Sequence, residues 1–428
     1  METIRRTQLM PGVFLTSVHT NKFKSSLLSV TLLTPLSAQT ATVNALIPSL
    51  LRRGSQAHPD MQSLSAALDE MYGGSIEPVV RKKGETQCVG FVGSFLDDAY
   101  SLDHSGILPR AAELMGELLL RPYTVDGAFC PDYTRQEKAN LADRIRAEVN
   151  DKRQYAVNRV VEEMCNREPY AVGRMGREAD VEAITPQSAW AQYVSLLAHS
   201  RVELYYCGSA QESEVCAILQ KAFRDLPREG GYDLQETVVV PAAQSVRQVS
   251  ERMDVAQGKL TMGFRTGGVT AASEEYPALV LCNALFGGTT TAKLFLNVRE
   301  KLSLCYYASS SLQKFKGLMV VSSGVEFSNK ERAENEILAQ LDACRHSQFE
   351  PWEVDGARRY TVSSLLTVPD SQGRQEDWWL GQAILGLDPT HTPQALADQI
   401  EAVTLEQAVA MAQRLSLDTV YFLTGKEG

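Results

Sequence analysis

Histidine is scarce in this sequence. The chain has six histidines in 428 residues, and no two are closer than 39 positions: His19, His58, His104, His199, His346 and His391. A compact hydrolytic zinc site needs imidazoles and carboxylates clustered around the ion, most simply as two histidines on one face of a helix. The sequence has no such pair, so we expect no zinc site of this kind. Cys344 and His346 are close enough to share a metal, but we expect both to be surface residues at a helix end.

Closely spaced cysteines are also missing. None of the eight cysteines forms a CxxC pair, and the two nearest, Cys207 and Cys216, are nine positions apart. A thiolate metal site therefore has no support. A chain of this length can bury a sizeable core without disulfides, so we expect free buried thiols and a reducing compartment, and we expect the protein to be cytoplasmic.

Basic residues are outnumbered by acidic ones. The chain has 42 Lys and Arg against 52 Asp and Glu, which gives a formal net charge of −10. This field repels phosphate backbones and acidic lipid surfaces, so we expect neither a nucleic-acid partner nor a membrane partner. Residues 25–51 carry no charge, but their hydroxyl and amide side chains, together with Pro35 and Pro48, argue against a membrane span.

Common catalytic motifs are absent as well. The sequence contains no G-x-S-x-G and no G-x-x-x-x-G-K-[ST], and the hydroxyl-rich residues 287–291 (GGTTT) lack a suitably placed lysine for phosphate binding. We interpret that segment as a helix cap. The sequence therefore offers no cofactor site and no complete catalytic centre.

What the sequence does contain is an internal repeat. A predicted strand, turn, helix and glycine over residues 26–54 recurs over residues 259–287, with Gly54 and Gly287 lying 233 positions apart. The same offset carries Lys83-Gly84 onto Lys316-Gly317, and each pair stands between two runs that predict a hairpin: 75–81 with 87–95, and 305–312 with 318–325.

A second repeated segment lies near the end of each half. Residues 181–185 (VEAIT) recur as residues 400–404 (IEAVT), each followed by a predicted helix and a short strand, 202–207 or 419–424. Thr185 and Thr404 are suitable N-caps, with Pro186 at the first helical position in one copy and Gln407 completing a capping box in the other. Two unrelated helix starts could share this chemistry, but three matches in one order favour duplication.

These patterns predict an α+β protein of two homologous domains, each an antiparallel or mixed sheet with helices packed on one face. We assign residues 1–224 to the first domain and 245–428 to the second. Residues 225–244 combine charge, glycine and proline without helical or strand period, and they are predicted to be the linker.

One segment of the second half has residues suited to peptide binding. Arg299 stands near the end of a predicted helix and Tyr306 seven residues later at the start of a strand, so a short turn could bring both side chains to one surface. A guanidinium and a phenol can both bind peptide carbonyls. The alternative is a surface arginine in a charge run beside an aromatic strand residue.

Trp378 and Trp379 are adjacent on a predicted helix, and neighbours on a helix point about 100° apart. One of the two could therefore be exposed at an interface, or both could be buried.

Several stretches resemble the insulinase, pitrilysin and mitochondrial processing peptidase family of zinc peptidases over nearly the whole chain. They are residues 50–55 (LLRRGS), 72–75 (YGGS), 168–176 (EPYAVGRMG) and 286–306, the last ending in a pattern similar to the family's R-E-K-x-x-L-x-Y. The resemblance implies repeated α+β domains that form half of a clam-like pair. The nearest pattern is a catalytically inactive bacterial subfamily associated with elongation factor P modification.

The metal motif of that family is degenerate here. Its H-x-x-E-H should fall directly before Leu50, where this sequence has Ala45, Pro48 and Ser49 in place of the two imidazoles and the carboxylate. The distal glutamate ligand aligns with Asp143 or Arg144. The resemblance therefore implies that the fold is kept while the hydrolytic centre is lost, with no metal and no cofactor.

The resemblance also implies a function. Half-size members often work as pairs in which one chain carries zinc and the other carries an arginine and a tyrosine that hold substrate, here Arg299 and Tyr306. The resemblance thus implies a non-catalytic peptide-binding subunit paired with an active paralogue of similar size, which would not hydrolyse peptides by itself. One alternative is a homodimeric peptide-binding or scaffold protein. Another is an active metallopeptidase with displaced ligands.

Overall fold

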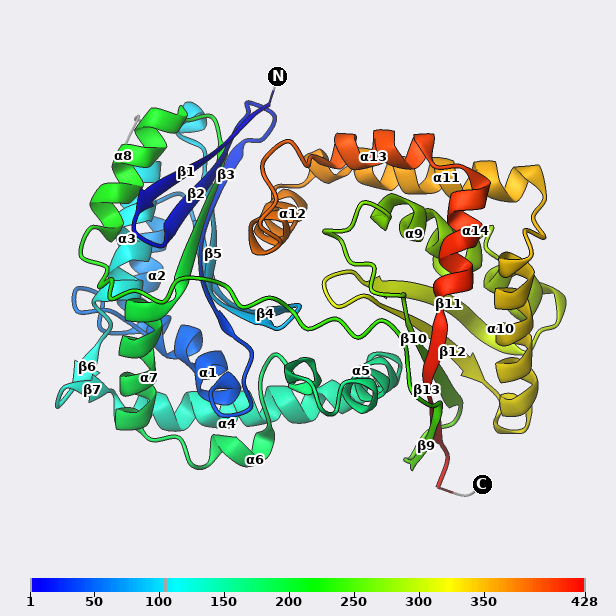
Figure 1. Ribbon diagram of the computed structural model, residues 1–428. Coiled ribbons are helices and arrows are strands. Elements are labelled where there is room, and N and C mark those ends of the chain that lie inside the picture. The colour runs from blue at the N-terminus through cyan, green and yellow to red at the C-terminus, as the bar shows by residue number, and fades with distance from the viewer. Residues whose placement is uncertain (1, 103–105, 427–428) are drawn as a thin grey trace. The chain divides into compact units, whose positions relative to one another are not determined.

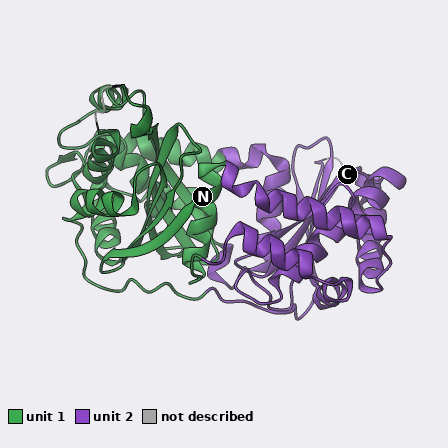
Figure 2. Ribbon diagram, turned by 90° about the horizontal axis from the view of Figure 1, so that it is seen from above, with its two compact units in different colours: residues 1–146, 172–236, 371–389 green, residues 147–171, 237–370, 390–428 purple. Residues whose placement is uncertain are grey.

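The computed structural model describes residues 2–102 and 106–426, which form two compact units that are each discontinuous in sequence (Figure 2). Unit 1 comprises residues 1–146, 172–236 and 371–389, and unit 2 comprises 147–171, 237–370 and 390–428. The predicted halves, 1–224 and 245–428, are therefore not the same sets of residues as the units. The chain between Phe223 and Arg247, which includes the predicted linker, contains neither helix nor strand.

Unit 1 is built on a mixed sheet with the strand order β1-β2-β8-β3-β5-β4. Neighbouring strands are antiparallel except for β2 and β8, which are parallel. The strands are β1 (Thr3–Met10), β2 (Val13–His19), β3 (Ser25–Pro35), β4 (Ser75–Lys83), β5 (Thr86–Leu96) and β8 (Arg201–Gly208). A separate two-stranded ribbon pairs β6 (Thr124–Val125) with β7 (Ala128–Phe129).

Unit 2 repeats this topology with the strand order β11-β12-β10-β13-β9, in which β13 and β9 form the parallel pair. Its strands are β9 (Arg247–Arg252), β10 (Gly258–Arg265), β11 (Cys305–Gln313), β12 (Leu318–Val325) and β13 (Ser416–Thr424). The correspondence runs β3 to β10, β4 to β11, β5 to β12, β8 to β13 and β2 to β9. This shared order confirms the predicted α+β fold of two homologous units.

Most helices of each unit lie on one side of its sheet, some of them packed on other helices. In unit 1 they are α1 (Ala41–Leu51), α2 (Met61–Asp69), α3 (Ile107–Leu120), α4 (Pro131–Ala147), α6 (Glu178–Val181), α7 (Pro186–His199) and α8 (Glu212–Phe223). In unit 2 they are α9 (Tyr276–Asn283), α10 (Lys330–Arg345), α11 (Pro351–Leu366), α13 (Pro393–Ala402) and α14 (Leu405–Arg414). Thr185 and Thr404 form capping boxes at α7 and α14, which confirms both predicted helix starts.

The opposite face of each sheet is covered by a helix from the other half of the sequence. Helix α5 (Lys152–Met164) packs on unit 2, and α12 (Gln372–Ile384) packs on unit 1 (Figure 1). Strand β12 is buried on both faces of the sheet. Met319 and Val321 lie in the main core of unit 2, whereas Leu318 and Val320 pack against α5. The sequence did not predict this exchange. Both Trp378 and Trp379 are buried on α12, so neither is an exposed interface residue.

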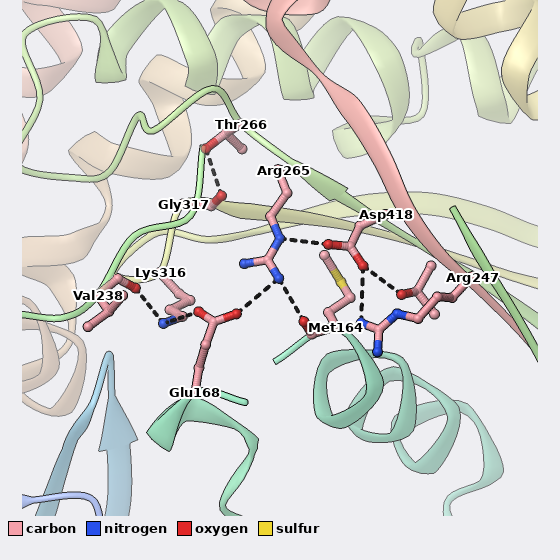
Figure 3. Close-up of polar contacts among 10 residues, drawn as sticks. Met164, Glu168, Val238, Arg247, Arg265, Thr266, Lys316, Gly317 and Asp418 are labelled. Carbon is pink, nitrogen blue, oxygen red and sulfur yellow. Dashed lines mark hydrogen bonds and ion pairs between the residues drawn. The ribbon is translucent and has the colours of Figure 1, made fainter. Parts of the chain in front are cut away.

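A buried ion cluster ties the α5 segment to unit 2 (Figure 3). We call it the Glu168 cluster: Glu168, Arg265, Lys316 and Asp418. Arg265 donates from Nη2 to Glu168 Oε1 at 3.0 Å and from Nε to Asp418 Oδ2 at 2.8 Å, and Lys316 Nζ lies 2.7 Å from Glu168 Oε2. Arg265 also donates to the carbonyl oxygen of Met164 at the end of α5, at 2.7 Å. Since Lys316 is fully buried, Glu168 supplies it with a neutralising charge.

Unit 1 holds α12 by an equivalent contact. Lys83, which the 233-residue offset matches with Lys316, is 6% exposed and places Nζ 2.7 Å from Asp377 Oδ1. Arg81 pairs with Glu376 of α12 at 2.5 Å. Each lysine precedes a turn glycine of positive φ, Gly84 at 57° and Gly317 at 67°, a conformation that glycine adopts without strain. The two repeats therefore use the same hairpin lysine to hold their exchanged helices.

Candidate functional site

The positions that match the lost metal motif lie on α1 and contain no zinc ligand. Ala45 is fully buried, Pro48 is a helix-interior proline, and Ser49 is half-buried. The Ser49 hydroxyl accepts a hydrogen bond from Arg144 Nη2 of α4 at 3.3 Å. Of the two residues predicted for the distal ligand position, Arg144 thus contacts the motif, whereas the Asp143 carboxylate pairs with Arg146 at 3.2 Å. A guanidinium at this place opposes a divalent cation, and these residues do not fit zinc.

Pro48 also leaves this position of α1 without a group that could activate a water molecule. A carboxylate at this position could serve as a general base, but the proline ring has no ionisable group and no amide N–H. The preceding turn is occupied by an amide network, in which buried Asn44 donates to Gln87 Oε1 at 3.0 Å and accepts from Gln192 Nε2 at 2.9 Å. This part of α1 is therefore structural, with its polar groups committed to neighbouring elements.

The histidines within residues 2–102 and 106–426 form no alternative metal centre. Among the residues that the structure describes, no group of three or more His, Cys, Asp and Glu side chains could hold a metal ion. His58 lies 3.3 Å from Glu117, and His346 contacts the Asp342 carbonyl at 2.9 Å. Cys344 is buried, which corrects the prediction that it lies on the surface. His104 falls outside the described residues.

None of the eight cysteines, all of which lie in the described residues, forms a disulfide, and six of them are buried. Burial raises the pKa of the Cys282 thiol to about 12, and burial likewise raises the pKa of Cys88 to about 12 despite nearby lysine and arginine charge. Because thiolates are the reactive form, these two thiols are poor nucleophiles.

No helix in the described part of the chain is long and apolar enough to cross a bilayer.

Arg299 and Tyr306 lie together on the surface of unit 2. Arg299 belongs to the π-helical segment η5 (Leu294–Lys301), which ends in a turn where Ser303 adopts a φ of 50°. The chain then enters β11, and Arg299 Nε donates to the carbonyl oxygen of Tyr306 at 3.0 Å. A β-bulge between Cys305 and Tyr307 leaves Tyr306 outside the regular pairing, with its side chain 65% exposed. The predicted turn therefore brings the two residues into contact.

Two further carboxylates complete this surface. Glu300 Oε1 lies 3.0 Å from Arg299 Nη1, and Glu326 Oε1 accepts a hydrogen bond from the Tyr306 hydroxyl at 3.1 Å. The hydrogen bond to Glu326, together with its charge, raises the pKa of Tyr306. The sequence analysis missed Glu326. The predicted hairpin could have identified it, because the register pairs Cys305 with Val325 and so sets residue 326 beside the start of β11.

The chain matches known proteins over nearly its whole length. The family model described as "Peptidase M16 inactive domain" matches residues 183–360. A Bacillus subtilis protein described as "Probable inactive metalloprotease YmfF" is 34% identical over 411 residues, which cover 96% of this chain and 95% of that relative.

Two solved structures share the fold. A conserved protein from Enterococcus faecalis has a TM-score of 0.91 at 28% identity, with 99% of each chain covered. A peptidase M16 inactive domain from Pseudomonas fluorescens has a TM-score of 0.79 at 17% identity and covers 99% of this chain and 98% of its own. The family model and the description of the Bacillus subtilis relative, together with the missing zinc ligands, support a non-catalytic role. The chain belongs to the insulinase, pitrilysin and mitochondrial processing peptidase family, M16.

Proposed function

We propose that this chain is the non-catalytic, peptide-binding subunit of a heterodimeric zinc-peptidase-like complex. The observation that carries the proposal is the exposed contact between Arg299 and Tyr306 in a chain whose metal-motif positions lack zinc ligands. An arginine fork and a phenol can both bind the polar groups of an extended peptide. The expected partner is an active paralogue of similar size that supplies the zinc. We expect the complex to be cytoplasmic.

The first experiment asks whether the chain acts alone. It is purified from its own host, and bound zinc, peptide hydrolysis and native mass are measured. We expect no stoichiometric zinc, no hydrolysis by the isolated chain and a co-purifying chain of similar mass that contains H-x-x-E-H. A mass of two identical chains would favour the homodimeric scaffold. Stoichiometric zinc with robust hydrolysis by the isolated chain would support an active metallopeptidase and would exclude the proposal.

The second experiment tests the two residues. Arg299→Ala and Tyr306→Phe should lower peptide turnover by the assembled pair roughly tenfold, the scale of about 1.4 kcal/mol of lost binding. Native mass should stay unchanged, because Tyr306 is exposed and the Arg299 side chain is 39% exposed. Arg332→Ala, which removes an exposed arginine of α10, is the matched control and should leave turnover unchanged. Equal turnover by all three variants and the native pair would mean that Arg299 and Tyr306 do not hold substrate.

A further inference from the structure

Glu326 decides how Tyr306 can bind a ligand. A phenol has a single proton, and the Tyr306 hydroxyl donates this proton to Glu326 Oε1 at 3.1 Å. While the carboxylate is ionised, the outward side of the phenol is a lone pair. Tyr306 therefore faces a ligand as a hydrogen-bond acceptor, whereas binding to a peptide carbonyl would require it to donate.

The backbone holds this pair in place. Tyr306 is the bulged residue of β11, and Glu326 directly follows β12, so the two residues lie at the same end of one hairpin. Arg299 fixes the bulge by donating to the Tyr306 carbonyl oxygen. The phenol and the carboxylate thus keep their mutual position through the main chain, and less ordering is needed when a ligand binds.

The guanidinium of Arg299 still has N–H groups that a ligand can bind. Its Nε is used by the Tyr306 carbonyl and its Nη1 by Glu300, while Nη2 makes no hydrogen bond to a described residue. The surface therefore offers N–H donors of Arg299, including both on Nη2, and at the same end of the hairpin an acceptor pair, the Tyr306 oxygen and the Glu326 carboxylate. A ligand that matches these groups has a carbonyl oxygen for Arg299 and a nitrogen that bears protons for the acceptor pair.

Local charge favours a cation over a neutral N–H group. Arg299 and Glu300 offset each other as an ion pair at 3.0 Å, Glu326 places a negative charge at the Tyr306 hydroxyl, and Lys330 is paired with Glu334 at 2.7 Å. The upward shift of the Tyr306 pKa agrees with a negative potential at the phenol. A lysine or arginine side chain, or an amino-terminal ammonium, would meet both the acceptor pair and this charge.

We propose that Glu326 is a specificity-determining residue that makes the Arg299–Tyr306 surface select peptides bearing a cationic nitrogen. The inference rests on the proposed function, since it names the substrate class of that same surface. Arg299 binds the peptide carbonyl, and the Tyr306–Glu326 pair binds the cationic group. Glu326 acts on Tyr306 by fixing the direction of its hydroxyl proton, and it contributes its own charge to the ligand.

The test uses the chain as purified, with any partner that co-purifies. The protein is immobilised and exposed to an amidated, amino-terminally acetylated nonapeptide pool that is randomised except for a central Lys, Arg, Gln or norleucine. Captured peptides are quantified by mass spectrometry. We expect the native chain to enrich Lys and Arg peptides about fivefold over Gln and norleucine, the scale of one exposed ion pair. A second pool with free amino termini shows whether a terminal ammonium can replace the side chain.

The variants separate the two proposals. Glu326→Gln keeps size and polarity, and it should abolish the enrichment while peptides are still captured through Arg299. Glu331→Gln removes an exposed carboxylate of α10 nearby and should preserve the enrichment. If Arg299→Ala lowers capture but Glu326→Gln leaves the composition of captured peptides unchanged, the role of Glu326 is wrong while the binding surface stands. If Arg299→Ala and Tyr306→Phe leave capture unchanged, the proposed function itself fails.

Discussion

At the scale of single residues, the candidate site depends on one strained backbone position. Ser303 has a φ of 50° in the turn between η5 and β11, a conformation that costs a residue with a Cβ about 1–2 kcal/mol. Its N–H donates to the carbonyl oxygen of Arg299, and the next N–H, of Leu304, donates to that of Val298. This tight turn reverses the chain direction. As a result, the carbonyl oxygen of Tyr306 lies within hydrogen-bond distance of the Arg299 side chain.

Substitutions at Ser303 should therefore change stability in opposite directions. Ser303→Gly should be neutral or stabilising by up to about 1 kcal/mol, since glycine adopts positive φ freely. Ser303→Val should lower the free energy of unfolding by about 1–2 kcal/mol, because β-branched residues are disfavoured there. Urea unfolding followed by circular dichroism measures both. A valine variant as stable as the glycine variant would show that the turn is not strained.

At the scale of elements, local patterns predicted most of the fold but not the exchange of helices. The hairpins at 75–96 and 305–325 follow from alternation and turn residues, which are local signals. Helix amphipathicity shows that α5 and α12 each bury a face, but it does not show against which sheet, because both sheets have similar apolar faces. The available signal was the matched pair Lys83 and Lys316, two lysines that become buried only when an acidic partner is present.

The Glu168 cluster should stabilise the docking of the α5 segment. Glu168→Gln leaves the cations of Arg265 and Lys316 buried with less compensation, so it should lower the free energy of unfolding by about 3 kcal/mol. The matched control is Glu182→Gln, whose side chain is 99% exposed and should cost under about 0.5 kcal/mol. Urea midpoints of the two variants and the native chain provide the comparison, and equal midpoints would contradict a stabilising cluster.

A second contact of α5 should give stability a dependence on pH. Glu251 of β9 accepts hydrogen bonds from Tyr155 of α5 and Tyr421 of β13, both at 2.7 Å, and Arg159 lies 3.3 Å away. Burial raises the pKa of Glu251, but these hydrogen bonds and the arginine outweigh it and leave the pKa lowered. Its stabilisation is therefore fully present above the unfolded pKa of about 4.3 and is lost as pH falls through the lower folded value.

Glu251→Gln should accordingly cost about 1 kcal/mol at pH 7, and the difference from the native chain should shrink below about pH 4. Thermal unfolding of both proteins between pH 3 and pH 7 measures this difference. Glu182→Gln is again the control, because its side chain is 99% exposed. A difference that stays constant down to pH 3 would mean that Glu251 does not titrate with folding.

At the scale of the whole molecule, the exchange makes each compact unit depend on both halves of the sequence. Unit 2 buries Val160 and Met164 of α5 against Leu318 and Tyr421 of its sheet. Unit 1 packs Leu380 of α12 beside Leu33 and Cys88. Each large apolar side chain that is buried in this way contributes about 1.5–3 kcal/mol, so neither sheet is complete without its exchanged helix.

Separating the chain between residues 236 and 237 should therefore give two fragments that do not fold alone. Fragment 1–236 has α5 without its sheet, and fragment 237–428 has α12 without its sheet. Expressed separately, they should bind a hydrophobic dye and lack near-ultraviolet circular dichroism; expressed together, they should associate one to one and recover the native spectrum. As a control, the intact chain cut at an inserted protease site at this position should elute as one species in buffer and as two in urea. Native-like spectra from both separate fragments would show that the exchanged helices are dispensable for folding.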